Sequence, residues 1–571
     1  MKARRFLAVV LAVTVLLFGL GAGAWWLVWQ RSPLQLQHRR LALPRAARFV
    51  PRDAAFSFYL LSDPEAPLAY ARAVAPASRR RQAGDTLARL RDGAFAAAGL
   101  DYDGELADWL GSDTAVWLLA DGQAAPAGWV LALASRDGDG ARRFLQRFWQ
   151  TRSLAGTELQ ISSYRGMGLI SGRGALRGQE PLPLATALID DDLVLLASGR
   201  GALEQALDVS QIDELNQAAD PRLVERLSRL GDGVALLTGR LEALQTWLAQ
   251  PLPAGGALVA ALRPEGRELV LEGWLQTVTA AAEPLPSLPG AADEGEALLE
   301  ALHGEADSIA LLRNPAQWPE PWRQALLQLQ RIGAADAPLP ALLLQQAPGV
   351  LLWREGADGR LLGTRPAPGD PAGLAPSLLQ QGLVAAPLEF DGHPVEVWTR
   401  LRVGAAGGRL EATLAAARSE QDGWAWWSDS LEALGRQQRG RGQPRALRAR
   451  FEALAMPEAA LRWAGVGERA QALLQRWAGW RLLSALAGQP LAETVQAVAL
   501  AVEPESLPKS LPKSLQESQP QPGLLSDLQS DLLSDPLSEL QSDPQSDPQS
   551  ELRSPLRAQA LRLRLRLAFG A

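Results

Sequence analysis

Alternating apolar segments occur in both halves of this 571-residue chain, and they limit its fold more than any other feature. Residues 255–276 read GGALVAALRPEGRELVLEGWLQ, two such segments joined by Pro-Glu-Gly. Alternation with period two is typical of half-buried strands, and the short turn predicts an antiparallel hairpin. In the second half, residues 493–505 match the first strand and residues 560–569 (ALRLRLRLAF) match the second. The pattern therefore predicts the same hairpin twice.

A low-complexity stretch separates the two strands of the second hairpin. Residues 524–554 repeat a tetrad of Ser, an acidic residue and two others, interrupted by Pro536, Pro544 and Pro548. Proline disfavours a helix, the lack of β-branched residues disfavours a strand, and the composition is typical of disorder. We expect residues 504–556 to be a disordered Ser-, Asp- and Pro-rich insert in the last hairpin. Repeat expansion without function explains it; the alternatives are an anionic tether, a weak Ca²⁺ site or a phosphorylation substrate.

Other segments recur in the same order and predict an internal duplication. Residues 219–248 and 444–477 both read as helix, strand and helix; residues 185–207 and 412–435 both read as strand, turn, strand and helix. Short turns between consecutive strands indicate antiparallel pairing. The predicted fold class is α+β, with two similar modules of antiparallel sheets and packed helices. The expected modules are residues 46–281 and 303–571, joined by a linker at 282–302.

An uncharged stretch at residues 6–29 lies close to the N-terminus. About 20 apolar residues suffice to cross a bilayer, and Trp25, Trp26 and Trp29 at one end are typical of a membrane interface. The stretch predicts a transmembrane helix in the lipid bilayer, followed by a juxtamembrane linker at 30–45. The alternative is a signal peptide cleaved after Ala24. With such an anchor, the bulk of the chain is expected in the periplasm or the thylakoid lumen.

Composition excludes several classes of site. The chain has no cysteine, which excludes disulfides, thiol nucleophiles and cysteine zinc sites. The net charge of −6 comes from the acidic residues between 503 and 553, so no clustered basic face remains for nucleic acid.

The polar residues that could carry chemistry all have simpler explanations. The three histidines are His38, His303 and His393, and no nucleophile or carboxylate stands beside them in a recognisable arrangement. Consecutive carboxylates at Asp190, Asp191 and Asp192 diverge, so they predict a hairpin turn rather than a metal site.

Three further groups of residues also have simpler explanations than a functional site. The acids Asp101, Asp103, Glu105 and Asp108 are expected in one exposed segment rather than across a cleft. The Gly-rich residues 164–178 predict a flexible surface loop, because they lack the setting of a phosphate-binding loop. Most tryptophans are expected in the core, although exposed ones bind sugars, lipids or peptides in other proteins; the residues concerned are Trp318, Trp322, Trp424, Trp426, Trp427, Trp463, Trp477 and Trp480. No catalytic, cofactor-binding or metal-binding residue is predicted.

Four segments carry a family likeness. They are residues 49–61 (FVPRDAAFSFYLL), 99–111 (GLDYDGELADWLG), 128–149 and 191–207. Together they resemble the membrane-anchored cyanobacterial proteins catalogued as domain of unknown function 3352, over about residues 46–569 apart from the insert. The resemblance implies a cyanobacterial source, a membrane segment and a large uncharacterised domain, and it brings no catalytic residues.

These observations predict an uncharacterised single-pass membrane protein that acts as a non-enzymatic binding or scaffold module. Its partner would be an unknown envelope or thylakoid protein, with no cofactor and no nucleic acid. The alternatives are a lipid or pigment carrier with an apolar cavity, and an enzyme of unrecognised type.

Overall fold

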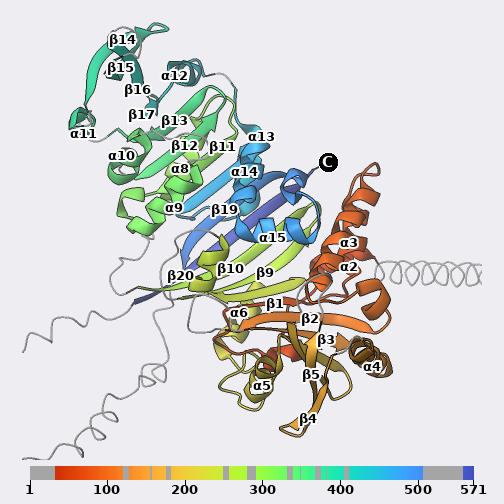
Figure 1. The fold of residues 1–571 in the computed structure, drawn as a ribbon. Coiled ribbons are helices and arrows are strands. Elements are labelled where there is room, and N and C mark those ends of the chain that lie inside the picture. The colour runs from red at the N-terminus through yellow and green to blue at the C-terminus, as the bar shows by residue number, and fades with distance from the viewer. Residues whose placement is uncertain are drawn as a thin grey trace, which may run out of the picture.

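The computed structural model describes residues 32–119, 128–154, 157–174, 182–248, 256–279, 291–330, 338–347, 349–366, 375–380, 382–403, 410–440, 442–505 and 557–570. Within these ranges twenty strands join into one sheet, and every pair is antiparallel. The molecule is elongated (Figure 1), with the first half (residues 32–279) at one end and the second half (residues 291–570) at the other.

The first half supplies ten strands among its described residues. They are β1 (Phe56–Leu60), β2 (Leu110–Leu119), β3 (Gly128–Ser135), β4 (Gln160–Tyr164), β5 (Met167–Gly174), β6 (Leu182–Ile189), β7 (Leu193–Ala197), β8 (Ala235–Arg240), β9 (Gly256–Glu265) and β10 (Glu268–Thr279). Its helices are η1 (Pro33–His38), η2 (Arg45–Phe49), α2 (Ala66–Val74), α3 (Arg80–Ala97), the π-helix η3 (Tyr102–Leu106), α4 (Gly138–Leu154), α5 (Arg200–Val209), α6 (Pro221–Leu230) and α7 (Leu241–Leu248).

The described part of the second half also supplies ten strands. They are β11 (Ser308–Arg313), β12 (Val350–Gly356), β13 (Gly359–Thr364), β14 (Leu383–Phe390), β15 (His393–Val403), β16 (Leu410–Gln421), β17 (Trp424–Ser428), β18 (Leu461–Val466), β19 (Val495–Glu505) and β20 (Arg557–Phe569). Its helices are α8 (Ala291–Glu300), η4 (Pro315–Gln317), α9 (Glu320–Gln330), α10 (Pro338–Gln346), α11 (Ala375–Gln380), α12 (Leu431–Gln438), α13 (Arg445–Leu454), α14 (Glu468–Arg476), α15 (Ala478–Leu486) and η5 (Leu491–Thr494).

The two halves have the same strand order. In the first half neighbouring strands run β4-β5-β6-β7-β3-β2-β1-β8-β9-β10. In the second half they run β14-β15-β16-β17-β13-β12-β11-β18-β19-β20, so that each strand corresponds to the one ten places earlier. The corresponding strands β10 and β20 pair antiparallel, from Glu268 opposite Ala568 to Thr279 opposite Arg557. Antiparallel pairing of equivalent strands relates the halves by an approximate two-fold axis.

This architecture corrects the predicted fold class. The prediction of two modules with separate sheets, behind a transmembrane helix, is wrong, because β20 pairs with β19 on one edge and with β10 on the other. An alternating pattern shows which face of a strand is buried but not how many neighbours its edges have. Among the described residues no helix combines the length and apolar character needed to cross a membrane. The predicted helix at residues 6–29 lies outside the described residues, and the structure does not support it.

The last hairpin is present, as the alternating segments predict. Strands β19 and β20 pair from Val495 opposite Phe569 to Glu505 opposite Ala560. Residues 506–556, which include most of the predicted insert, lie between these strands in sequence and outside the described residues.

Helix α6 shows how local sequence fixes an element. Asp220 precedes it and accepts a hydrogen bond from the Arg222 backbone N–H at 3.0 Å, and Pro221 takes the first helical position. Gly231 follows with a φ of +73°, a conformation that glycine adopts without strain. The leucines on one face are buried, and β8 and α7 follow. The predicted order of helix, strand and helix at residues 219–248 is confirmed.

Strand β20 alternates leucine with arginine because its two faces have different neighbours. Leu561 and Leu567 belong to an apolar cluster with residues of α7 and α14. On the other face Arg562 and Arg564 donate to Glu272 of β10, at 3.1 and 2.9 Å. The ion pairs therefore join the two halves across the central strand pair, and the leucines bury one side of it.

Candidate ligand cavity

A cavity of about 1280 Å³ lies in the first half. Its walls come from the C-terminal end of α3, the π-helix η3, the last turn of α4 and strands β5 and β6, together with residues 157–160. Three arginines and three acidic residues line it: Arg152, Arg173, Arg200, Asp101, Glu105 and Glu158. Leu100, Leu159, Pro183 and Leu184 add apolar surface. Volumes of a few hundred to about 1,000 Å³ are typical of small-molecule sites, so this cavity has room for a ligand.

The π-helix η3 places acidic groups on one wall. π-helical turns are rare and are frequent at functional sites. Arg91 holds this turn, since its guanidinium lies 3.7 Å from the centre of the Tyr102 ring and 3.2 Å from a carboxylate oxygen of Asp103. At the other side of the turn, Glu105 Oε2 accepts a hydrogen bond from the Asp101 backbone N–H at 2.9 Å. These contacts fix the position of Glu105 beside the cavity.

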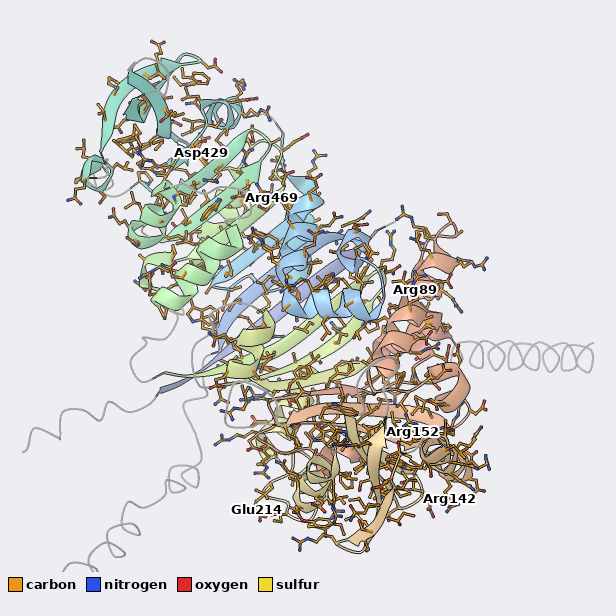
Figure 2. All side chains as sticks on the ribbon, in the orientation of Figure 1. Arg89, Arg142, Arg152, Glu214, Asp429 and Arg469 are labelled. Atoms are coloured by element: carbon orange, nitrogen blue, oxygen red, sulfur yellow. The ribbon has the colours of Figure 1, made fainter. Side chains whose placement is uncertain are left out.

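Arg152, in the last turn of α4, supplies a half-buried cation to the lining (labelled in Figure 2). Its guanidinium carbon lies 3.4 Å from the centre of the Phe148 ring. Its Nη1 donates to the Phe148 carbonyl at 3.1 Å and its Nη2 to the Gly99 carbonyl at 3.4 Å. No carboxylate of the described residues lies within ion-pair distance of it. Burial lowers the pKa of Arg152, and the charge of Glu105 only partly offsets this effect.

Gly172 of β5 forms part of the cavity wall, and its counterpart in the second half is a tryptophan. The turns Arg165-Gly166 and Asp391-Gly392 join corresponding strands, and all four residues have positive φ. Gly172 is the sixth residue after the first turn, and Trp398 is the sixth after the second. Trp398 is fully buried, and its ring centre lies 5.2 Å from that of Trp427.

The same correspondence holds for Arg152. It is the third residue from the end of α4, and Leu378 is the third from the end of α11, at the same chain distance before Trp398. Leu378 is fully buried and belongs to one apolar cluster with Trp398. In the first half, the Arg152 guanidinium and Gly172 border a cavity. In the second half, the side chains of Leu378 and Trp398 occupy the corresponding space.

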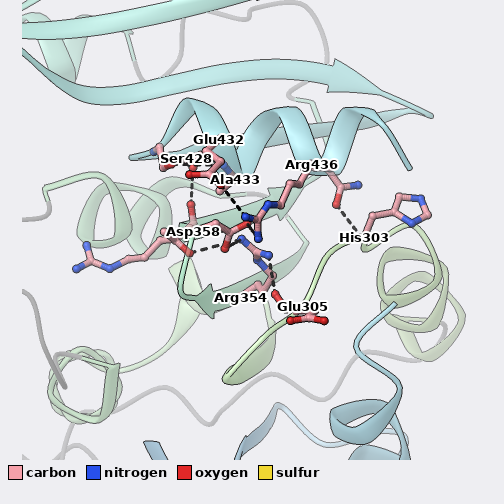
Figure 3. A network of polar contacts seen from close by, with 12 residues as sticks. His303, Glu305, Arg354, Asp358, Ser428, Glu432, Ala433 and Arg436 are labelled. Carbon is pink, nitrogen blue, oxygen red and sulfur yellow. Dashed lines mark hydrogen bonds and ion pairs between the residues drawn. The ribbon is translucent and has the colours of Figure 1, made fainter. Parts of the chain in front are cut away.

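The second half instead buries a charged network at the turn between β12 and β13 (Figure 3). Arg354 is fully buried and donates to Asp358 and to the Glu305 carbonyl, both at 2.7 Å. Arg436 of α12 lies 3.5 Å from the second carboxylate oxygen of Asp358. Close by, the His303 backbone N–H donates to Gln437 at 2.8 Å. This network ties α12 to the hairpin.

The aspartates 190–192 form the turn that the sequence predicts. Asp190 and Asp191 have positive φ and join β6 to β7. Arg45 pairs with Asp190 and Asp192, and Arg142 lies 2.5 Å from Asp191. The described residues hold no group of three potential metal ligands.

The histidines and tryptophans also have defined positions. His38 and His393 are exposed, whereas His303 is half-buried beside α12. Trp318, Trp424, Trp426, Trp427 and Trp463 are buried, which confirms the prediction that they belong to the core. Trp477 and Trp480 are only partly buried against it.

One prediction about this region is wrong. The Gly-rich residues 164–178 do not form a flexible loop as a whole, because Met167–Gly174 is strand β5, paired on both edges. Leu169 and Ser171 are both buried on one face of this strand. The glycines beside them hide the alternating apolar pattern that would otherwise indicate a strand. Asp101, Asp103 and Asp108 are exposed on one segment, as predicted, and Asp101 and the half-buried Glu105 of that segment also line the cavity. Sequence reasoning missed Arg152 and Gly172; aligning the two halves through their turns provides the signal that finds them.

A family model with the description "protein of unknown function (DUF3352)" matches residues 9–340. The chain belongs to the DUF3352 family. The DUF3352 match contains the whole cavity and extends past α9 into α10. The resemblance stated above is thus shown at the level of the family, while the cyanobacterial source and the membrane attachment stay predictions.

Other comparisons add little to this family assignment. No curated protein matches the chain. A solved structure described as "Structure of crystal form IV of TP0453" aligns with 41% of this chain and 81% of its own, at 10% identity and a TM-score of 0.24. A TM-score this low supports no conclusion about fold or function.

Proposed function

We propose that the protein is a non-enzymatic binding protein and that the cavity of the first half holds a small polar ligand. The observation that carries the proposal is the difference between equivalent positions. Gly172 and Arg152 border a cavity in one half, and Trp398 and Leu378 fill the corresponding space in the other. The lining includes exposed residues such as Asp101, Glu158 and Arg173, so the space is open to solvent and accessible to a ligand. A concave site present in one of two similar halves and filled in the other is the kind of place where ligands bind.

Binding fits the lining better than catalysis does. The cations of the cavity are guanidiniums, which stay protonated at all ordinary pH values and therefore orient anions rather than transfer protons. The acids Asp101 and Glu105 stand on a single short turn, and Glu105 already accepts a backbone hydrogen bond. A lipid or pigment carrier is less well supported, because six charged side chains line the cavity.

Retention of a ligand tests the proposal. The full chain is incubated with the small-molecule fraction of source cells, desalted and examined by native mass spectrometry. In the variant Gly172→Trp an indole projects from the cavity wall. Its Cβ alone would lie 3.0 Å from the Glu158 carbonyl oxygen and 3.0 Å from Leu159 Cδ2, so residues 157–159 must shift, and the larger side chain is expected to obstruct the cavity that these residues line. Gly168→Trp is the matched control on the same strand, since a Cβ at Gly168 meets nothing within 4 Å.

The proposal expects a bound small molecule in wild type and in Gly168→Trp, and none in Gly172→Trp. No bound molecule in wild type, or equal retention by a folded Gly172→Trp variant, would contradict it. If Gly172→Trp does not fold, Arg152→Leu, which copies Leu378, replaces it in the comparison.

A further inference from the structure

The charges in the cavity carry an inference about the class of ligand, which rests on the proposed function. Arg152 and Arg173 contribute cations, and within the described residues neither has a carboxylate at ion-pair distance. Arg200 is already paired, since its Nε donates to Glu204 at 2.7 Å. On the acidic side Asp101, Glu105 and Glu158 line the same space.

Arg152 has the properties of an anion-binding group. Its two Nη atoms each use one hydrogen for a backbone carbonyl, which leaves their second hydrogens for another acceptor. The guanidinium is stacked on Phe148, and this contact fixes its plane. A carboxylate matches such a plane through two parallel hydrogen bonds, and a partly desolvated guanidinium gains more from that pairing than an exposed one.

The acids prevent a purely anionic ligand from fitting the cavity well. Glu105 is held by the Asp101 N–H on the π-turn, and its charge partly offsets the lowering of the Arg152 pKa by burial. Glu105 nevertheless lies beyond ion-pair distance from Arg152, so the two charges do not form a direct ion pair. An anion at Arg152 is attracted by the guanidinium and repelled by the carboxylates of the lining, whereas a molecule that also has a positive group is attracted by both.

We infer that the ligand is a zwitterion of the size of a short peptide, with its carboxylate on Arg152 and its ammonium group beside Asp101 and Glu105. The volume of about 1280 Å³ exceeds that of a typical single-metabolite site and leaves room for several residues. Thr151, Thr157 and Ser171 line the same space. The hydroxyls of Thr151 and Thr157 donate to the Arg147 and Arg173 carbonyls, so their oxygens remain available to accept from peptide N–H groups.

Three matched probes test this inference by titration calorimetry with the full chain. They are trialanine, N-acetyl-trialanine, which lacks the ammonium group, and trialanine amide, which lacks the carboxylate. We expect trialanine to bind and each blocked form to bind at least about tenfold more weakly, a difference of about 1.4 kcal/mol. Arg152→Leu should lose the preference for the free carboxylate. Glu105→Gln should lose the preference for the free ammonium group while it keeps an acceptor for the Asp101 N–H.

Arg147→Leu is the matched control, because Arg147 is an exposed residue of the same helix and does not line the cavity. Equal affinity for trialanine and its acetylated form would overturn the zwitterion in favour of a simple anion. If no probe binds while wild type still retains a molecule that Gly172→Trp loses, the ligand class is wrong and the proposed function stands. If that retention is also absent, both fail.

Discussion

Trp398 occupies in the second half of the sheet the position that Gly172 occupies in the first, six residues after a turn of the same conformation. The indole is fully buried and stacked against Trp427, whereas the glycine borders a cavity. One strand order thus supports a filled site and an open one. The difference lies in side-chain volume at a few positions, which makes it accessible to substitution.

Removing the indole should open the second half. Trp398→Ala is expected to lower the free energy of unfolding by about 3–5 kcal/mol, because it deletes a fully buried ring and leaves a cavity. Guanidinium denaturation of the full chain measures the loss. Trp477→Ala is the control and should cost clearly less, since Trp477 is only partly buried. Equal losses would show that Trp398 does not fill its site as described.

The contact between α3 and α15 holds the two halves together away from the central strands. A Cβ at Gly93 would lie 1.9 Å from the Leu486 carbonyl oxygen, so Gly93→Ala forces these helices apart. We expect a loss of about 1–3 kcal/mol in the free energy of unfolding. Gly479→Ala in α15 is the control; a Cβ there meets nothing within 4 Å, and this change should stabilise by up to about 1 kcal/mol. A neutral Gly93→Ala would contradict the close approach.

Glu272 makes stability depend on pH. Burial raises the pKa of Glu272, but the ion pairs with Arg562 and Arg564 outweigh burial and hold that pKa below its usual value of 4.5. Because the folded state binds the proton more weakly than the unfolded state, the stabilisation is present above pH 4.5 and is lost as pH falls through the lowered pKa. Glu272→Gln should cost about 2 kcal/mol at pH 7 and less at low pH. A loss that does not change with pH would refute the ion-pair explanation.

The buried pair in the second half should behave as a unit. Asp358→Asn leaves Arg354 buried without its full countercharge, and we expect a loss of about 3–5 kcal/mol in the free energy of unfolding. The double variant Arg354→Met, Asp358→Leu should lose less than the sum of its single variants, because it removes both charges together. A double-mutant cycle by denaturation measures this coupling, and strict additivity would show that the pair does not interact.

The long connection in the last hairpin should be dispensable for folding. Replacing residues 506–556 with a short Gly-Ser linker shortens the loop between β19 and β20, whose pairing register remains available. Loop closure then costs less by up to about 2 kcal/mol, so the melting temperature should stay the same or rise. A large fall in melting temperature would show that these residues contribute contacts to the fold.

The sequence predicts the elements of this protein better than their assembly. Helix α4 follows from the periodic spacing of Phe144, Leu145, Phe148 and Trp149, all of which are buried. The pairing of the two halves cannot be predicted from the sequence. The alternation of β20 does not indicate that Arg562 and Arg564 contact Glu272, on a strand about 290 residues earlier. Such long-range partners depend on which edges remain free once each half has folded.

The cavity was hidden for a related physical reason. A cavity forms where side chains are too small to fill the space, and a sequence pattern does not indicate such a place. From the sequence, Gly172 is predicted to be an ordinary glycine of a flexible loop, although it lines the cavity. Arg152 reads as an exposed residue at a helix end, although its stacking on Phe148 half-buries it. Only the comparison with Trp398 and Leu378 shows that both positions normally belong to a packed interior.

The central claim is that the ligand of this protein lies between Arg152 and the π-turn in the first half. An experimentally determined structure of the protein with its retained small molecule tests that claim most directly. We expect density for the ligand against the Arg152 guanidinium and beside Gly172 and Glu105, with the site around Trp398 and Leu378 closed. Ligand density at another place, or a first-half cavity filled by residues 157–159, would contradict the assignment.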